Sequence, residues 1–173
     1  MSRTKGNGRG LVFLAALVFV GALVIGPTLL FAKMEPPAPK ALCDDRMLQT
    51  GAMLNSNYLT VNVYNASEKS GVANRVRINL ERNGFLGGIV ANYQGQLKPK
   101  NVMIFAQDKS DPKVKLLAKQ FKGKVEFAPA DFETKPGMNV VVGPKFKGVK
   151  KDAPTTLKVA TPIKVCVPTI DLA

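Results

Sequence analysis

Two regions of the chain change from a strand-like to a helix-like spacing of apolar residues. Apolar residues alternate with polar ones over residues 59–64, which is the period of a strand that covers one face. From Val72 onward the apolar residues recur at the spacing of an amphipathic helix, and Gly84 is placed to end that helix. Residues 60–85 are therefore predicted to form a strand, a short loop and a helix.

The second region begins at Asp111, which is followed by proline in the manner of a helix N-terminus. The helix is predicted over residues 111–121. The element order is β-α-β-β-α-β-β, which predicts an α+β fold: a small split-βαβ sandwich with its helices on one sheet face. Further strands are expected at residues 89–93, 102–106, 125–127 and 138–142, with additional strand-like runs at 157–159 and 163–167.

Residues 11–32 contain no charged residue and are long enough to cross a membrane as one helix. Three basic residues, Arg3, Lys5 and Arg9, lie in the preceding tail of residues 1–10. The positive-inside rule therefore predicts a cytoplasmic N-terminus and an extracytoplasmic remainder. A cleaved signal peptide is the alternative, but the apolar run is longer than the usual signal core.

The segment from residue 33 to 57 is predicted to separate this anchor from the domain. It begins with a proline-rich spacer and continues as an arm without regular hydrophobic spacing. Cys43 lies on this arm and Cys166 lies near the other end of the chain. Two cysteines in a chain predicted to be extracytoplasmic favour a disulfide between them, with two free buried thiols as the alternative.

The order of elements over residues 60–85, with Asn-Ala-Ser after the strand and Asn-Gly-Phe after the helix, resembles the LytR C-terminal domain. This domain is an extracytoplasmic module of actinobacterial envelope proteins. The resemblance continues through the strand at 101–106 and the closing Val-Val-Val-Gly of 140–143, and it covers residues 58–148. Residues 149–173 form a C-terminal extension. The chain is similar to family members that carry this domain alone behind one anchor.

The resemblance implies a protein of the cell membrane that maintains cell-wall integrity and vesicle release. Its implied partners are cell-wall polymer or envelope-assembly proteins. The alternative is an accessory subunit of a large membrane complex that docks through its anchor helix, where Gly21 and Gly26 would allow close helix contact.

The composition argues against catalysis. The chain has no histidine, which removes the commonest general base and metal ligand. Ser67 and Ser70 consequently lack a base to activate them, and no phosphate-binding loop is present. The sequence predicts neither an enzyme nor a cofactor or metal site.

The net charge is +13, from 25 Lys and Arg against 12 Asp and Glu. Such a charge often indicates nucleic acid, but the predicted location excludes that partner and leaves headgroups and wall polymers. A surface that is merely solvated is the alternative. Lysines of the second helix, Lys113, Lys115, Lys119 and Lys122, are further candidates. The preferred ligand-binding residues are Tyr64, Asn65, Tyr93, Lys98 and Lys100, although the tyrosines also suit a cross-strand packing pair.

Overall fold

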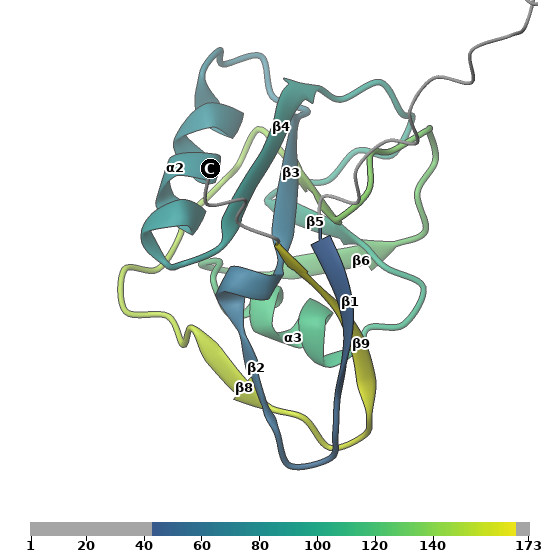
Figure 1. Ribbon diagram of the computed structural model, residues 1–173. Coiled ribbons are helices and arrows are strands. Elements are labelled where there is room, and N and C mark those ends of the chain that lie inside the picture. Colours follow the sequence, from purple (N-terminus) through teal and green to yellow (C-terminus); the bar gives the residue numbers. More distant parts are fainter. Residues whose placement is uncertain (1–42, 169–173) are drawn as a thin grey trace, which may run out of the picture. The chain divides into compact units, whose positions relative to one another are not determined.

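The computed structural model describes residues 43–168 (Figure 1). The predicted cytoplasmic tail, the anchor at residues 11–32 and the proline-rich spacer lie outside the described residues. Between residues 43 and 168, no helix has the length and apolar character needed to span a membrane.

A five-stranded mixed sheet forms the centre of the domain, in the order β4-β3-β7-β5-β6 (Figure 1). Strand β3 is parallel to both β4 and β7, β6 is parallel to β5, and β5 is antiparallel to β7. With the two helices described next, the core follows the predicted order β-α-β-β-α-β-β. The strands are β3 (Thr60–Asn65), β4 (Leu86–Asn92), β5 (Val102–Phe105), β6 (Val125–Ala128) and β7 (Met138–Val142).

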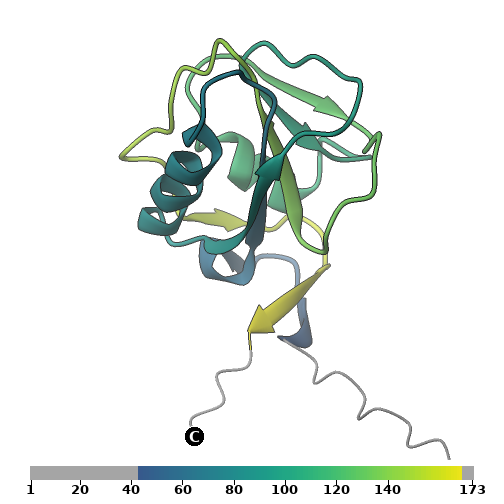
Figure 2. The same cartoon turned by 90° about the horizontal axis from the view of Figure 1, so that it is seen from above.

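Both predicted helices are present. Helix α2 (Val72–Arg82) lies against β3 and β4 (Figures 1 and 2), and it is followed by Gly84 at a left-handed φ of 82°. Helix α3 (Pro112–Ala118) begins where Asp111 accepts a hydrogen bond from the backbone N–H of Lys113 at 2.8 Å. It is shorter than the predicted range, which ran to residue 121.

The two helices bury their apolar residues in a single cluster against the same face of the sheet. Strands β3, β5 and β7 each contribute alternate residues to this cluster, as a strand covered on one face by helices should. The α+β class is therefore confirmed. The buried sheet and helix residues of the cluster include Val61, Val63, Val102, Ile104, Val140, Val142, Ala73, Val76, Leu80, Val114, Leu116 and Leu117.

The predicted split arrangement is wrong. In a split βαβ unit another strand lies between the two strands that the helix connects, whereas β3 lies directly beside β4, and β5 beside β6. Strand β7 instead joins the two units at the middle of the sheet, parallel to the first and antiparallel to the second. Hydrophobic spacing specifies which residues form strands but not which strands become neighbours.

Tyr64, one of the candidate ligand-binding residues, is buried. Its side chain is only 3% exposed and meets the Phe132 ring edge-on at a centroid distance of 4.9 Å. The Tyr64 hydroxyl donates to the Asn139 Oδ1 atom at 3.4 Å. Strand β3 is an inner strand, and its second face is covered by a smaller cluster that includes Met103. Both faces are therefore buried, and Tyr64 serves packing.

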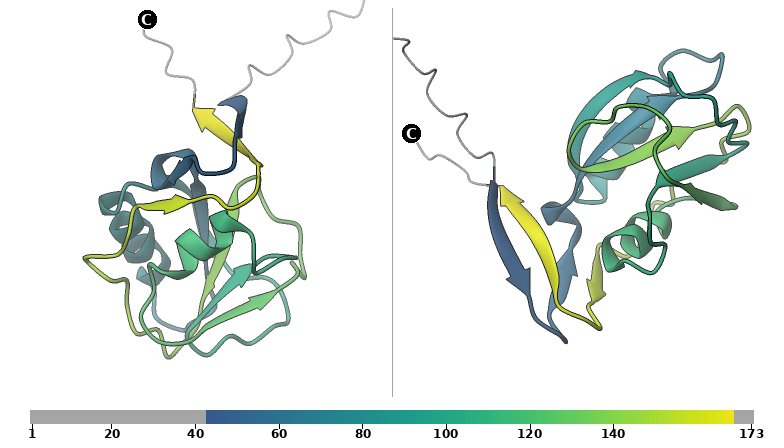
Figure 3. Two further views of the ribbon diagram at one scale, coloured as in Figure 1. Left: turned by 90° about the horizontal axis from the view of Figure 1, so that it is seen from below. Right: turned by 90° about the vertical axis from the view of Figure 1, so that its right-hand side faces the viewer.

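The arm that the sequence predicted to be irregular forms regular strands. Strand β1 (Cys43–Leu48) pairs with β9 (Ile163–Pro168), and β2 (Met53–Asn55) pairs with β8 (Thr156–Lys158), both antiparallel (Figure 3). A short 3-10 helix, η1 (Ser56–Tyr58), leads into β3. The backbone ladder with the C-terminal extension supplies the order that the spacing of apolar residues in the arm did not indicate.

The first of these ladders bears on the predicted disulfide. Cys166 is the cross-strand partner of Asp45, which lies two residues along β1 from Cys43. The pairing of β1 with β9 thus brings the two cysteine-bearing segments together from opposite ends of the domain. The Cys43–Cys166 bond itself stays a prediction.

Candidate functional site

One end of the sheet gathers several chain segments that carry polar and basic residues. The carboxyl ends of the parallel strands β3, β4 and β7 meet there. Because β5 is antiparallel to β7, the amino ends of β5 and its parallel neighbour β6 lie at the same end. In open sheets with parallel strands, ligands bind beyond the carboxyl ends of the strands.

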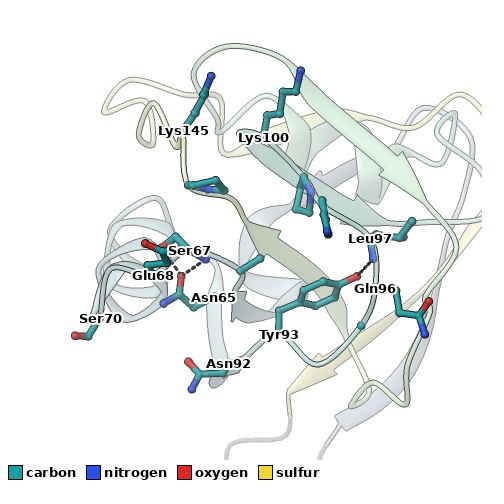
Figure 4. Close-up of a pocket in the computed structure, with 15 residues that line it drawn as sticks. Asn65, Ser67, Glu68, Ser70, Asn92, Tyr93, Gln96, Leu97, Lys100 and Lys145 are labelled. Atoms are coloured by element: carbon teal, nitrogen blue, oxygen red, sulfur yellow. Dashed lines mark hydrogen bonds between the residues drawn. The ribbon is translucent and has the colours of Figure 1, made fainter.

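A hollow of about 1160 Å³ occupies this end of the sheet (Figure 4). The loops that follow β3, β4 and β7 and the segment that precedes β5 form its walls. The hollow is lined by Asn65, Ala66, Ser67, Glu68, Ser70, Asn92, Tyr93, Gly95, Gln96, Leu97, Lys98, Pro99, Lys100, Pro144 and Lys145.

Asn65 shapes the wall of the hollow that follows β3. Its Oδ1 atom accepts from the backbone N–H and the hydroxyl of Ser67 at 3.1 and 2.7 Å, and its Nδ2 donates to the Lys69 carbonyl at 2.9 Å. These bonds form the local turn that short amide side chains favour. The Asn65 amide is thus engaged with its own loop, which it holds in place.

Tyr93 and Asp131 fix the opposite wall. The Tyr93 hydroxyl donates to Asp131 Oδ2 at 2.7 Å and accepts from the backbone N–H of Leu97 at 2.9 Å (Figure 4 shows the latter). The same carboxylate oxygen accepts from the backbone N–H groups of Gln96 and Leu97 at 2.6 and 3.0 Å. One carboxylate therefore closes the loop between Tyr93 and Leu97.

This hydrogen-bond network shifts the pKa of both Tyr93 and Asp131. Desolvation, followed by the hydrogen bond to Asp131, raises the pKa of Tyr93 to about 12. Desolvation works to raise the pKa of Asp131, but hydrogen bonds from Tyr93, Leu97 and Gln96 outweigh it and leave that pKa below its ordinary value. At neutral pH the pair is a neutral phenol donating to a charged carboxylate.

Lys100 and Lys145 lie at one rim of the hollow with their side chains directed away from Tyr93 (Figure 4). The backbone N–H of Lys145 donates to the carbonyl oxygen of Lys100 at 2.8 Å. Gly143 permits this approach, because a Cβ atom there would overlap the carbonyl oxygens of Pro99 and Lys100. Lys98 adds a third cation to the lining.

The structure brings four of the five predicted ligand-binding residues into one place. The hollow is lined by Asn65, Tyr93, Lys98 and Lys100. Tyr64 is instead buried in the smaller cluster that includes Met103. The lysines of the second helix do not line it. Lys113 instead lies 3.6 Å from Asp111 in an ion pair, and Lys115 and Lys119 are exposed on and beside α3. A role in binding stays a prediction for the four residues that line the hollow.

Sequence reasoning missed Lys145, Gly143 and Asp131. Lys145 follows a strand and a Gly-Pro pair, so it could have been found if β7 had been recognised as parallel to β3. No sequence signal links Asp131 to Tyr93, because the loop that carries Asp131 reaches the site only through the fold.

The lining chemistry is cationic. Among the lining residues, three are lysines and one, Glu68, is acidic, while the Asp131 carboxylate lies behind the lining, where it bonds Tyr93, Gln96 and Leu97. Over residues 43–168 no group of three acidic, cysteine or histidine side chains could hold a metal ion. Lysines, backbone amides and hydroxyls are groups that bind phosphate or carboxylate oxygens.

The described part of the protein is a small α+β domain with a mixed sheet and a basic surface at one end of that sheet. Comparison with protein families then identifies the family to which it belongs. The family model described as LytR cell envelope-related transcriptional attenuator matches residues 58–146. The chain belongs to this LytR C-terminal family and carries its cell-envelope-related domain.

Two further comparisons complete the picture. The chain is similar to the crystal structure of the soluble domain of a conserved hypothetical secreted protein, an Rv2700 ortholog, from Mycobacterium marinum. The TM-score is 0.45 at 21% sequence identity, and the match covers 59% of this chain and 68% of that one. Comparison with the curated proteins found no match.

Proposed function

We propose that this chain is a non-enzymatic, membrane-anchored extracytoplasmic protein that maintains the cell envelope by binding wall polymer or wall-assembly proteins. The observation that carries the proposal is the hollow, which presents Lys98, Lys100 and Lys145 beyond the parallel strands of an envelope-related domain. The anchored topology rests on the uncharged residues 11–32 and the basic residues before them.

Wall polymer fits the hollow best among the proposed partners. Lysine is a flexible point charge that suits diffuse anionic targets, whereas planar bidentate recognition would favour arginine. Tyr93 lines the same hollow as the three lysines, and polar side chains such as Asn92 and Gln96 share the lining. An anionic polymer with sugar units would find charges, hydrogen-bonding groups and an aromatic edge together. The roles in wall integrity and vesicle release follow from the likeness to single-anchor members of the family.

Co-sedimentation with purified cell wall tests the proposal. The full chain in a non-ionic detergent is incubated with wall material at low and at moderate salt. Because the contact is electrostatic, the bound fraction should fall as salt rises, and Lys98→Glu with Lys100→Glu should remove most of it. Lys115→Glu with Lys119→Glu provides the control, since it reverses the same number of exposed charges outside the hollow.

Retention that ignores both salt and the reversal at Lys98 and Lys100 would overturn polymer binding through the hollow. The domain would then act through contacts with wall-assembly proteins.

A further inference from the structure

Three lysine-bearing loops converge on one buried side chain, that of Asn101. Its side chain is only 6% exposed. The Asn101 Nδ2 atom donates to the carbonyl oxygens of Lys122 and Lys124, both at 2.8 Å, and Oδ1 accepts from the backbone N–H of Lys147 at 2.8 Å. A single amide therefore ties the loop before β6 to the loop after β7, and both to its own segment before β5.

Further contacts fix these loops against each other. The backbone N–H of Lys122 donates to the carbonyl oxygen of Gly148 at 3.0 Å. A Cβ atom at Gly123 would come within 2.8 Å of Lys147 Cδ, so the stem of Lys147 lies across that glycine. Gly123 also has a left-handed φ of 74°, which glycine adopts without strain. The backbone that carries these lysines is thus held in place by hydrogen bonds and packing.

Six of the lysines on these loops form what we call the lysine track. Each is exposed, and within residues 43–168 none of them forms an ion pair with a carboxylate. Like charges gathered without partners repel one another, and a bound anion relieves that repulsion. The lysine track consists of Lys98, Lys100, Lys122, Lys124, Lys145 and Lys147.

The sheet sets the length of the track. Its three segments adjoin β7, β5 and β6, which are consecutive neighbours. Strands in a sheet lie about 4.8 Å apart, so the outer two segments leave strands about 10 Å apart. A single phosphate or carboxylate group has too few oxygens to bind all six lysines of these three segments at once. A chain with repeated charges can contact all of them.

We propose that the lysine track binds an extended polymer that carries repeated phosphate or carboxylate groups, and that the hollow is one end of this longer binding surface. The inference rests on the proposed function and specifies its ligand as a multiply charged chain. The track is continuous with the hollow through Lys98, Lys100 and Lys145, which belong to both. All six cations are lysines, so the track accepts either anionic group as a point charge.

Probes of matched chemistry and different length test the inference on the full chain in non-ionic detergent. Long-chain polyphosphate is compared with pyrophosphate, and poly-L-glutamate with glutarate. Lys122→Glu with Lys124→Glu changes only the end of the track that lies outside the hollow. It should weaken binding of a long polymer by about tenfold at low salt and leave the short probe unchanged. Lys98→Glu with Lys100→Glu should weaken both.

Two controls complete the design. Lys115→Glu with Lys119→Glu should weaken binding of the long polymers much less than Lys122→Glu with Lys124→Glu does, and an anionic phospholipid in mixed micelles should compete poorly with the long polymers. Wild-type affinity of the Lys122 and Lys124 variant for both long polymers would overturn the lysine track while leaving the hollow and the proposed function intact. The inference would also be overturned if the control variant weakened polymer binding as much as Lys122→Glu with Lys124→Glu does. It would be overturned as well if the Lys122 and Lys124 variant lost affinity for the phospholipid alone. Loss of salt-dependent binding to purified wall would instead contradict the proposed function.

Discussion

Lys145 donates its backbone N–H to the carbonyl oxygen of Lys100 at 2.8 Å, which fixes two lysines from distant segments next to each other. Both lysines line the same hollow. A folded protein brings like charges together at an energetic cost, which a bound anion reduces. The pair is therefore the part of the sheet end that is best organised to receive an anionic group.

The first prediction concerns Asn101, which holds the lysine loops. Asn101→Ala removes three hydrogen bonds from a buried position and should lower the free energy of unfolding by about 2–3 kcal/mol. Chemical denaturation measures this change. The exposed Asn92→Ala is the control and should change stability by less than about 0.5 kcal/mol. Equal denaturation midpoints for the two variants would contradict the assigned role of Asn101.

A second prediction compares two glycines with left-handed backbone. Gly84 and Gly71 have φ values of 82° and 74°, so alanine is strained at both. Only at Gly84 would the new Cβ also meet Ser56 Oγ, at 2.7 Å. Gly84→Ala should therefore cost about 2–3 kcal/mol and Gly71→Ala about 1 kcal/mol. Thermal unfolding that ranks the two in the opposite order would show that the contact with Ser56 is unimportant.

The third prediction follows from the raised pKa of Tyr93, about 12 in the folded protein. A free phenol with its ordinary pKa is about nine-tenths ionised at pH 11, whereas Tyr93 should remain mostly protonated there. Ultraviolet absorbance of tyrosinate, taken as the difference between the wild type and Tyr93→Phe, isolates this group from the other tyrosines. A difference titration with a midpoint near pH 10 would contradict the network with Asp131.

The shifted pKa values of Tyr93 and Asp131 also predict how the stability of the protein changes with pH. Because the pKa of Tyr93 is raised on folding, its contribution is fully present below about pH 10 and is lost as pH rises toward 12. Because the pKa of Asp131 is lowered, its contribution is present above the ordinary carboxyl range and is lost in acid. Asp131→Asn should remove the loss of stability in acid that is due to this carboxyl group.

The fourth prediction is a disulfide between Cys43 and Cys166. Strands β1 and β9 place Cys166 opposite Asp45, two residues from Cys43. Peptide mapping without reductant should recover the two cysteine peptides linked, and replacing both cysteines by alanine should cost about 2–5 kcal/mol of stability. Recovery of both peptides as free thiols would disprove the bond.

Much of the fold was predictable because its elements have strong local signals. The change of spacing at Val72, the stop at Gly84 and the cap at Asp111 each act within a few residues of sequence. These signals indicate where an element begins and ends. They predicted the two helices and the order of the core elements along the chain.

The arrangement of the sheet could not be obtained in the same way. The insertion of β7 between β3 and β5 depends on contacts between distant residues, and it buries Tyr64 on a strand whose pattern suggested one exposed face. The candidate site was found in part, because Lys98 and Lys100 lie on a loop with clear turn residues. Lys145 and Asp131 reach it only through the same long-range contacts.

The salt dependence of polymer affinity tests the central claim most directly. The dissociation constant of the full chain for soluble polymer released from purified wall is measured over a range of salt concentrations. Log affinity falls linearly with log salt, and each cation that releases a counterion adds slightly less than one to the magnitude of this negative slope. Lys98→Glu with Lys100→Glu should therefore reduce the magnitude of the slope by about two. Lys115→Glu with Lys119→Glu should leave the slope at the wild-type value. Three identical slopes would contradict the claim that the basic end of the sheet binds the polymer.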